Sequence, residues 1–154
     1  MGITTIEWTA TVHPDGSATK GYSWNVVTGC TPISEGCRHC YAKSIATRFK
    51  GTPSWPHGFD VTLHPERLEQ PLRWKTPRRV FLCSAGDLFH EAVPDECIDR
   101  IFAVMACCQQ HRFLVLTKRP EGMAAWYSQT PSGATREQVV YEAMRARCPS
   151  ATWP

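Results

Sequence analysis

The fold of this chain is decided by two short apolar runs, 79-RVFLCS-84 and 113-FLVLT-117. Each run has the length of a strand, and unbroken apolar runs are typical of strands buried on both faces of a parallel sheet. Apolar residues recur at helical spacing in three further segments, at 94–110, 120–127 and 134–147. This alternation of strands and helices predicts a parallel sheet with right-handed crossovers.

The sequence before these runs supplies one more strand and one more helix. We expect a short strand at Tyr22–Val27 and a helix at 38–49. Residues 10–21 are rich in Gly, Ser, Thr and Pro and indicate a loop, so residues 1–21 as a whole are expected to be irregular. The sequence therefore predicts a single α/β domain over residues 1–154, with about three βα units and parallel strands.

The C-terminal segment, residues 149–154, follows a helix at a point where a fourth strand is due. About three βα units are too few to close a barrel on their own. We therefore expect either that the chain is a truncated form, or that a second copy of it or another partner completes its sheet.

The composition is ordinary for a globular protein, with 42% hydrophobic and 20% charged residues. The N-terminus lacks the charged segment and apolar run of a signal peptide, and no stretch approaches the ~20 apolar residues of a membrane span. We therefore expect a cytoplasmic protein that does not enter a membrane. The net charge of +3 allows a nucleic-acid or other anionic partner but does not argue for one.

Three of the eight cysteines are clustered, Cys30, Cys37 and Cys40. Disulfides rarely persist in a reducing compartment, so clustered cysteines there indicate metal or redox chemistry. The spacing C-x6-C-x2-C places the three thiolates in one loop ahead of a helix. Iron–sulfur clusters usually take four cysteines, and a [4Fe–4S] cluster held by only these residues would leave one iron free to bind a small molecule.

Two other interpretations of the cysteines stay open. A structural zinc site needs a fourth ligand, which Cys83, His57 or His90 could supply. Alternatively the cysteines are reduced and ligate nothing, since free cysteine often behaves as a small hydrophobic residue.

Each predicted strand leads directly into a polar cluster. The first strand leads to Thr28-Gly29-Cys30, the second to Ser-Ala-Gly-Asp at 84–87, and the third to Thr-Lys-Arg at 117–119. The carboxyl ends of parallel strands share one side of a sheet, where ligands bind. We therefore expect the three clusters to converge on one site.

Several motifs together resemble a phage and bacterial family of uncharacterised proteins that are similar to radical S-adenosylmethionine (SAM) enzymes. The resemblance covers about residues 6–127 and is carried by 24-WNVVTGC-30, 36-GCRHCYA-42, 61-VTLHP-65, 71-PLRW-74, Ser84 with 87-DLFH-90, and 116-LTKRP-120. It implies a partial (β/α) TIM-like barrel of the radical SAM type, a [4Fe–4S] cluster and SAM as co-substrate.

The resemblance also implies roles for the cysteines. Cys30, Cys37 and Cys40 would ligate the cluster, whose remaining iron binds the amino and carboxylate groups of SAM. An electron, delivered by a donor such as flavodoxin or ferredoxin, cleaves SAM to methionine and a 5′-deoxyadenosyl radical, which takes a hydrogen atom from the substrate. Nucleic acid or a nucleotide is the substrate class that phage association and mild basicity suggest.

The same resemblance assigns the other two clusters to SAM binding. Ser84, Gly86 and Asp87 lie where the superfamily holds the SAM amino group with a Gly-Gly-Glu-like segment, and Lys118 and Arg119 could hold a carboxylate or phosphate. A strand-to-helix turn with a capping aspartate, and solvated surface charge, are the plainer interpretations.

The chain departs from the superfamily pattern in two ways. The first cysteine gap is six residues instead of three. Relative to the six-unit barrel that the resemblance implies, we also expect about half of the barrel to be missing. A non-catalytic zinc-binding module and a catalytically inactive fragment therefore remain alternative functions.

Overall fold

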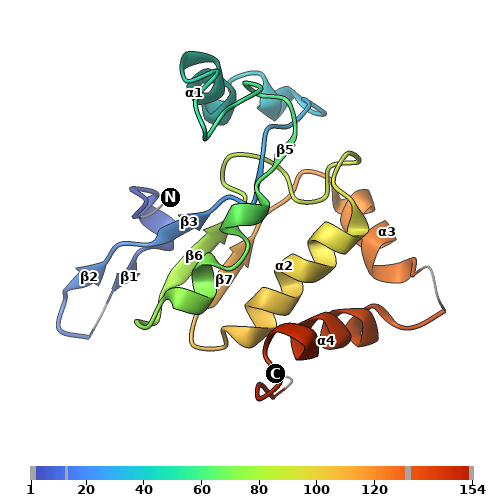
Figure 1. Ribbon diagram of the computed structural model, residues 1–154. Helices are drawn as coiled ribbons and strands as arrows, with labels where there is room; N and C mark the ends of the chain where they lie inside the picture. Colours follow the sequence, from blue (N-terminus) through green and yellow to red (C-terminus); the bar gives the residue numbers. More distant parts are fainter. Residues whose placement is uncertain (1–2, 13, 131–132, 153–154) are drawn as a thin grey trace.

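The computed structural model describes residues 3–12, 14–130 and 133–152 (Figure 1). Its centre is a three-stranded parallel sheet in the order β3–β6–β7, formed by Tyr22–Trp24, Arg79–Leu82 and Arg112–Val115. The two apolar runs of the sequence are thus neighbouring strands, with Val80 opposite Phe113. These strands form a small open sheet, and a (β/α) barrel of the radical SAM type remains a prediction.

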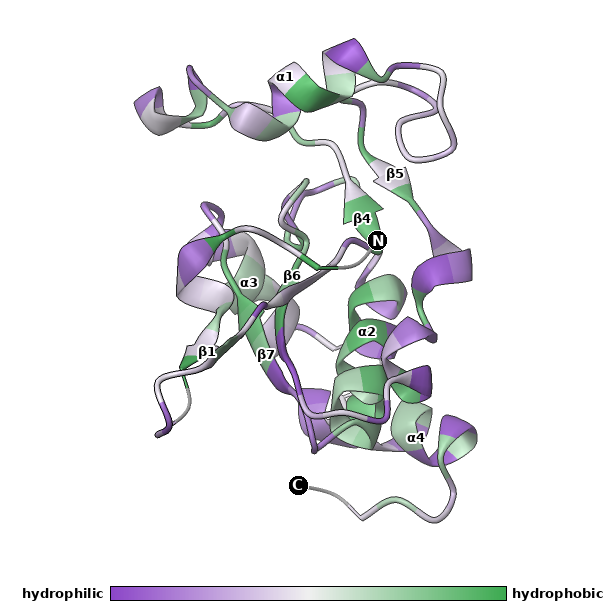
Figure 2. Cartoon of the chain, turned by 90° about the vertical axis from the view of Figure 1, so that its left-hand side faces the viewer, coloured by the Kyte–Doolittle hydropathy of each residue, from purple (hydrophilic) through white to green (hydrophobic). Residues whose placement is uncertain are grey.

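Three helices accompany the sheet. Helix α2 (Asp95–Cys107) connects β6 to β7, and α3 (Pro120–Ser128) and α4 (Arg136–Arg147) follow β7. Figure 2 shows α2 largely in green, the colour of hydrophobic residues. The core lies where the strands meet α2 and α4, and its fully buried members include Trp24, Leu82, Ile101, Val104 and Met144.

The strand expected at Tyr22–Val27 is divided between two sheets. Strand β3 ends at Trp24, and the chain then forms β4 (Val27–Thr28), which pairs antiparallel with β5 (Thr62–Leu63). The segment between β4 and β5 carries a 3-10 helix at Glu35–Cys37 and helix α1 (Tyr41–Arg48). Figure 1 shows this segment standing beyond the carboxyl ends of the parallel strands.

The N-terminal segment is more regular than its composition predicts. It contains a 3-10 helix at Glu7–Thr9 and an antiparallel hairpin formed by β1 (Thr11–Val12) and β2 (Ala18–Thr19). The side chain of Asp15 accepts a hydrogen bond from the Ser17 amide (2.9 Å), which is the type of local contact that stabilises turns. Short 3-10 helices also occur in the described chain at Pro65–Arg67 and Gln70–Arg73.

The described residues include no helix with both the length and the apolar character that crossing a bilayer requires.

Candidate functional site

The loops after β4 and β6 meet backbone to backbone. Gly29 and Gly86 form a parallel β-bridge, and the Gly29 amide donates to the carbonyl of Ala85 (2.9 Å). A Cβ on Gly86 would lie 2.8 Å from the Gly29 carbonyl oxygen, closer than side chains can approach. Glycine at position 86 therefore permits the contact that joins the first polar cluster to the second.

Asp87 joins the second cluster to the third. Its carboxylate accepts hydrogen bonds from the Thr117 hydroxyl (2.7 Å), the Lys118 amide (3.0 Å) and the Phe89 amide (3.0 Å). The residue is buried. Because three protein donors already occupy this carboxylate, the geometry favours the turn-and-cap interpretation of Asp87 over that of an acceptor for a ligand.

Ser84 is likewise engaged within the protein. Its hydroxyl donates to the side-chain oxygen of Asn25 (3.1 Å), and its carbonyl accepts a hydrogen bond from the Tyr41 hydroxyl. Asn25 also accepts from the Ala85 amide (3.2 Å). Asn25 follows the end of β3, so this contact fixes the loop after β6 against the neighbouring strand.

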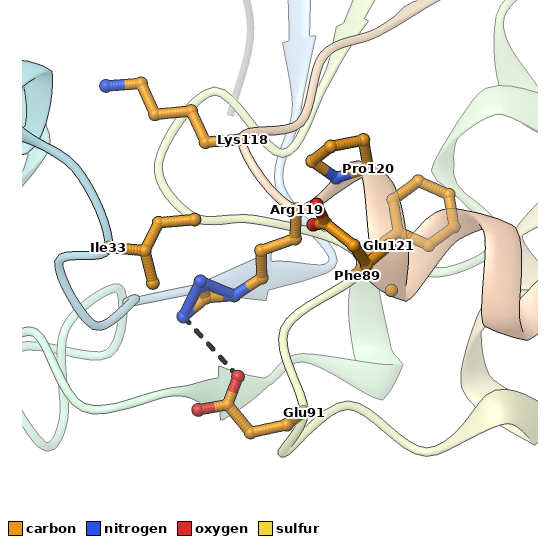
Figure 3. A pocket seen from close by; sticks show the side chains of 8 residues that line it. Ile33, Phe89, Glu91, Lys118, Arg119, Pro120 and Glu121 are labelled. Atoms are coloured by element: carbon orange, nitrogen blue, oxygen red, sulfur yellow. Dashed lines mark ion pairs between the residues drawn. The ribbon is translucent and has the colours of Figure 1, made fainter.

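Arg119 joins the third cluster to the first. Its Nη2 donates to the hydroxyl and carbonyl of Thr31, at 2.7 and 3.2 Å, and forms an ion pair with Glu91 at 3.4 Å (Figure 3). The residue is only 7% exposed, so it is not a solvated surface charge. Its Nε is buried and has no hydrogen-bond partner among the described residues.

His90 completes this network. Its Nδ1 accepts from the Ala92 amide (3.0 Å), and its Nε2 lies 2.9 Å from the Thr31 hydroxyl. Burial, followed by the charge of Arg119, lowers the pKa of the imidazole. The neutral ring therefore carries its proton on Nε2 and donates it to Thr31.

Lys118 reaches the cysteine loop. Its ammonium Nζ lies 3.7 Å from the sulfur of Cys37, and the Ser34 hydroxyl lies 3.5 Å from the same sulfur. The Ser34 hydroxyl, the backbone of Ile33 and Ser34, and then the Lys118 charge lower the pKa of Cys37 to about 7. This shift favours the thiolate, which is the form of cysteine that binds metals and acts as a nucleophile.

The other two clustered cysteines lie in the same loop. Burial raises the pKa of Cys30, the charge of Arg119 opposes this increase, and charges on Cys37 and Cys40 add to it. Cys40 is the residue immediately before α1. The three thiols are therefore electrostatic neighbours, and none is in a disulfide.

The three sulfurs do not form a ready-made metal site in this structure. Within the described ranges, no three His, Cys, Asp or Glu side chains are grouped as a metal ion needs. The donor set nevertheless fits a thiophilic metal or cluster, because three free thiols share one loop and one of them is acidified. Metal binding commonly orders its own ligands.

Two of the three candidates for a fourth zinc ligand are buried or hydrogen-bonded within the protein. Cys83 is fully buried, and burial raises its pKa to about 12. Both ring nitrogens of His90 take part in hydrogen bonds within the protein. His57 is exposed.

A cavity of about 580 Å³ opens beside this network (Figure 3). Arg119 and Glu91 meet on one side of it, whereas the Lys118 side chain extends away from them. The volume lies within the ~300–1,000 Å³ typical of ligand pockets. The residues that line the cavity are Ile33, Phe89, Glu91, Lys118, Arg119, Pro120, Glu121 and Gly122.

The sequence-predicted residues thus converge, but the contacts that join them use residues the sequence did not single out. Thr31 and Glu91 hold Arg119, and Ser34 acts on Cys37. Their signal in the sequence is weak: each is a polar residue in a loop that follows a strand, which is also where ordinary loop residues lie.

Comparison with known proteins assigns the chain to a family without assigning a function. No curated protein and no solved structure matches it. A family model described as "Protein of unknown function (DUF5131)" matches residues 3–153. The expectation of an uncharacterised family is therefore confirmed, and radical SAM character and phage origin stay predictions. The chain belongs to the DUF5131 family of proteins of unknown function.

Proposed function

We propose that this protein is an iron–sulfur protein of the radical SAM type, in which Cys30, Cys37 and Cys40 hold a [4Fe–4S] cluster. The observation that carries the proposal is the convergence at the carboxyl end of the parallel sheet. Lys118 lies 3.7 Å from the Cys37 sulfur, and Arg119 donates to Thr31, the neighbour of Cys30. When bound, the cluster and SAM supply the reductive cleavage chemistry that protein side chains lack.

The chain's own residues hold and orient this site. Lys118 favours the thiolate form of Cys37, and Arg119 fixes the backbone beside Cys30. The cavity of about 580 Å³ next to them is the place for SAM or substrate, where Lys118 and Arg119 would meet a carboxylate or phosphate. Ser84, Gly86 and Asp87 support this arrangement from the loop after β6.

The proposal includes the surroundings of the site. Eight free cysteines suit a reducing, cytoplasmic compartment. Flavodoxin or ferredoxin would deliver electrons at the exposed loop of residues 30–40, with nucleic acid or a nucleotide as substrate. A second copy of the chain, or another partner, would extend the open sheet into the partial TIM-like barrel.

Metal analysis tests this proposal directly. Anaerobically purified protein should contain about four iron and four sulfide per chain, and SAM should alter its absorption and electron paramagnetic resonance spectra. A variant with Cys30, Cys37 and Cys40 changed to alanine should lose the iron. A matched variant with Cys97, Cys107 and Cys148 changed to alanine should keep it.

Each alternative gives a different result. Iron retained by the first variant would overturn the ligand assignment. One zinc ion per chain, lost in the same variant and unaffected by SAM, would identify a zinc-binding module instead. A stable cluster that leaves SAM uncleaved under reducing conditions would identify a catalytically inactive fragment.

A further inference from the structure

A second cavity, of about 590 Å³, lies at the amino end of the parallel sheet, opposite the cysteine loop. Its lining includes four basic residues, Lys20, Arg78, Arg79 and Arg112, and no acidic residue. Thr11, from the β1–β2 hairpin, and Gln110 contribute polar groups. We call this feature the basic cavity.

The sheet itself brings the arginines together. Arg79 begins β6 and Arg112 begins β7, and the two are directly opposite each other in the parallel pairing. Like charges in this position repel and destabilise a sheet. The register thus brings two positive side chains to the same end of the sheet, where an anionic ligand would contact both.

The basic cavity keeps its positive charge unpaired among the residues that the structure describes. Across the described ranges, none of its four basic residues forms an ion pair. Arg79 donates from Nη1 to the Ala10 carbonyl (2.9 Å), but its buried Nε has no partner there. Figure 2 shows the start of β7 in purple, the colour of hydrophilic residues. This concentration of unpaired positive charge points to a ligand with several negative charges.

Arg78 adds a planar surface to these charges. Its guanidinium lies 3.8 Å from the ring centroid of Tyr22 and 5.1 Å from that of Trp74. These cation–π contacts hold the guanidinium at the wall of the cavity. Nucleobases stack on arginine planes as they do on aromatic rings. An acidic peptide or free phosphate would use the charges but not this plane.

We propose that the basic cavity binds single-stranded nucleic acid, with phosphates on Lys20, Arg79 and Arg112 and a base against the guanidinium of Arg78. This inference does not depend on the iron–sulfur proposal, because the two sites lie at opposite ends of the sheet.

Fluorescence anisotropy with a labelled 20-nucleotide single strand tests the inference. The full chain should bind, and Lys20→Gln/Arg112→Gln should weaken binding at least tenfold and reduce the salt slope by about 1.4, or ~0.7 per lost phosphate contact. The control Lys43→Gln/Arg100→Gln removes the same charge from exposed positions elsewhere and should bind within twofold of the unchanged protein. Equal losses in the two variants, or no binding at low salt, would overturn the site.

Two further arms define the ligand. Arg78→Lys keeps the charge but removes the plane, so it should weaken binding several-fold without changing the salt slope. Heparin or polyglutamate that competes as well as unlabelled single strand, or a duplex that binds equally, would overturn the assignment to single-stranded nucleic acid. The variant with Cys30, Cys37 and Cys40 changed to alanine should bind the single strand as tightly as the unchanged protein. This result would show that nucleic-acid binding does not depend on the iron–sulfur cluster.

Discussion

Arginines lie at both ends of the parallel sheet, but their surroundings differ. At the carboxyl end, Arg119 is buried and bonded to Thr31, with Glu91 beside it. At the amino end, Arg79 and Arg112 face each other without an ion pair in the described chain. The first arrangement holds one arginine through internal contacts, whereas the second leaves two arginines without an anionic partner among the described residues. Substitutions at the two ends should therefore have effects of opposite sign.

The largest effect is expected at Asp87, which connects all three donors at the carboxyl end. Asp87→Ala leaves the Thr117 hydroxyl and the amides of Phe89 and Lys118 without their acceptor. We expect the free energy of unfolding to fall by about 3 kcal/mol, because unpaired buried donors are costly. Urea denaturation measures this, with the exposed Asp60→Ala as control. A loss no larger than that of the control would show that Asp87 does not hold the site together.

The next effect concerns Arg119. Arg119→Gln should lower the free energy of unfolding by about 2 kcal/mol, because it removes charged hydrogen bonds to Thr31 from a buried position. The exposed Glu91 contributes little to this figure, so Glu91→Gln should change stability by less than ~0.5 kcal/mol. Equal effects of the two substitutions would contradict this division and place the stabilisation in the ion pair.

The two ends are alike in one respect, since each has a buried histidine nearby. Burial lowers the pKa of both His90 and His111, and the charge of Arg119 adds to the effect at His90. The unfolded chain then binds more protons than the folded chain below the free-histidine pKa of about 6.5, so stability is lost as the pH falls below that value.

Urea denaturation at pH 7, 6 and 5 should show this loss of stability. His90→Gln should reduce the slope of the free energy of unfolding against pH. The exposed His57→Gln serves as the control. A slope that His90→Gln does not alter would show that folding does not change the pKa of this ring.

The parts of this molecule that depend on the local pattern of apolar and polar residues could be predicted from the sequence. The apolar runs form β6 and β7, and the polar residues that follow them converge because parallel strands end on the same side. The sequence did not predict that the chain leaves the sheet after Trp24, because β4 is held by β5, a partner far along the sequence. The burial of Arg119 could not be predicted for the same reason, because its hydrogen-bond partner Thr31 is 88 residues away in the sequence.

The positions of the sulfurs show another limit. Spacing places Cys30, Cys37 and Cys40 in one loop, but the distances between them depend on the conformation of that loop and on any metal it binds. The basic cavity had no sequence motif at all. Its residues come from a hairpin, a loop and two strand starts, and only the parallel register brings Arg79 beside Arg112.

The smallest effect is the most direct test of the comparison between the two ends. Arg112→Gln relieves the repulsion from Arg79 and should raise the free energy of unfolding by about 0.5 kcal/mol at low salt. Salt screens exposed charges, so this gain should shrink as the ionic strength approaches 1 M. Gln replaces Arg here as it does at position 119, so the two substitutions differ only in their surroundings. A loss of stability in Arg112→Gln at low salt would show that the amino-end arginines stabilise the fold, and the argument that they are kept for a ligand would fail.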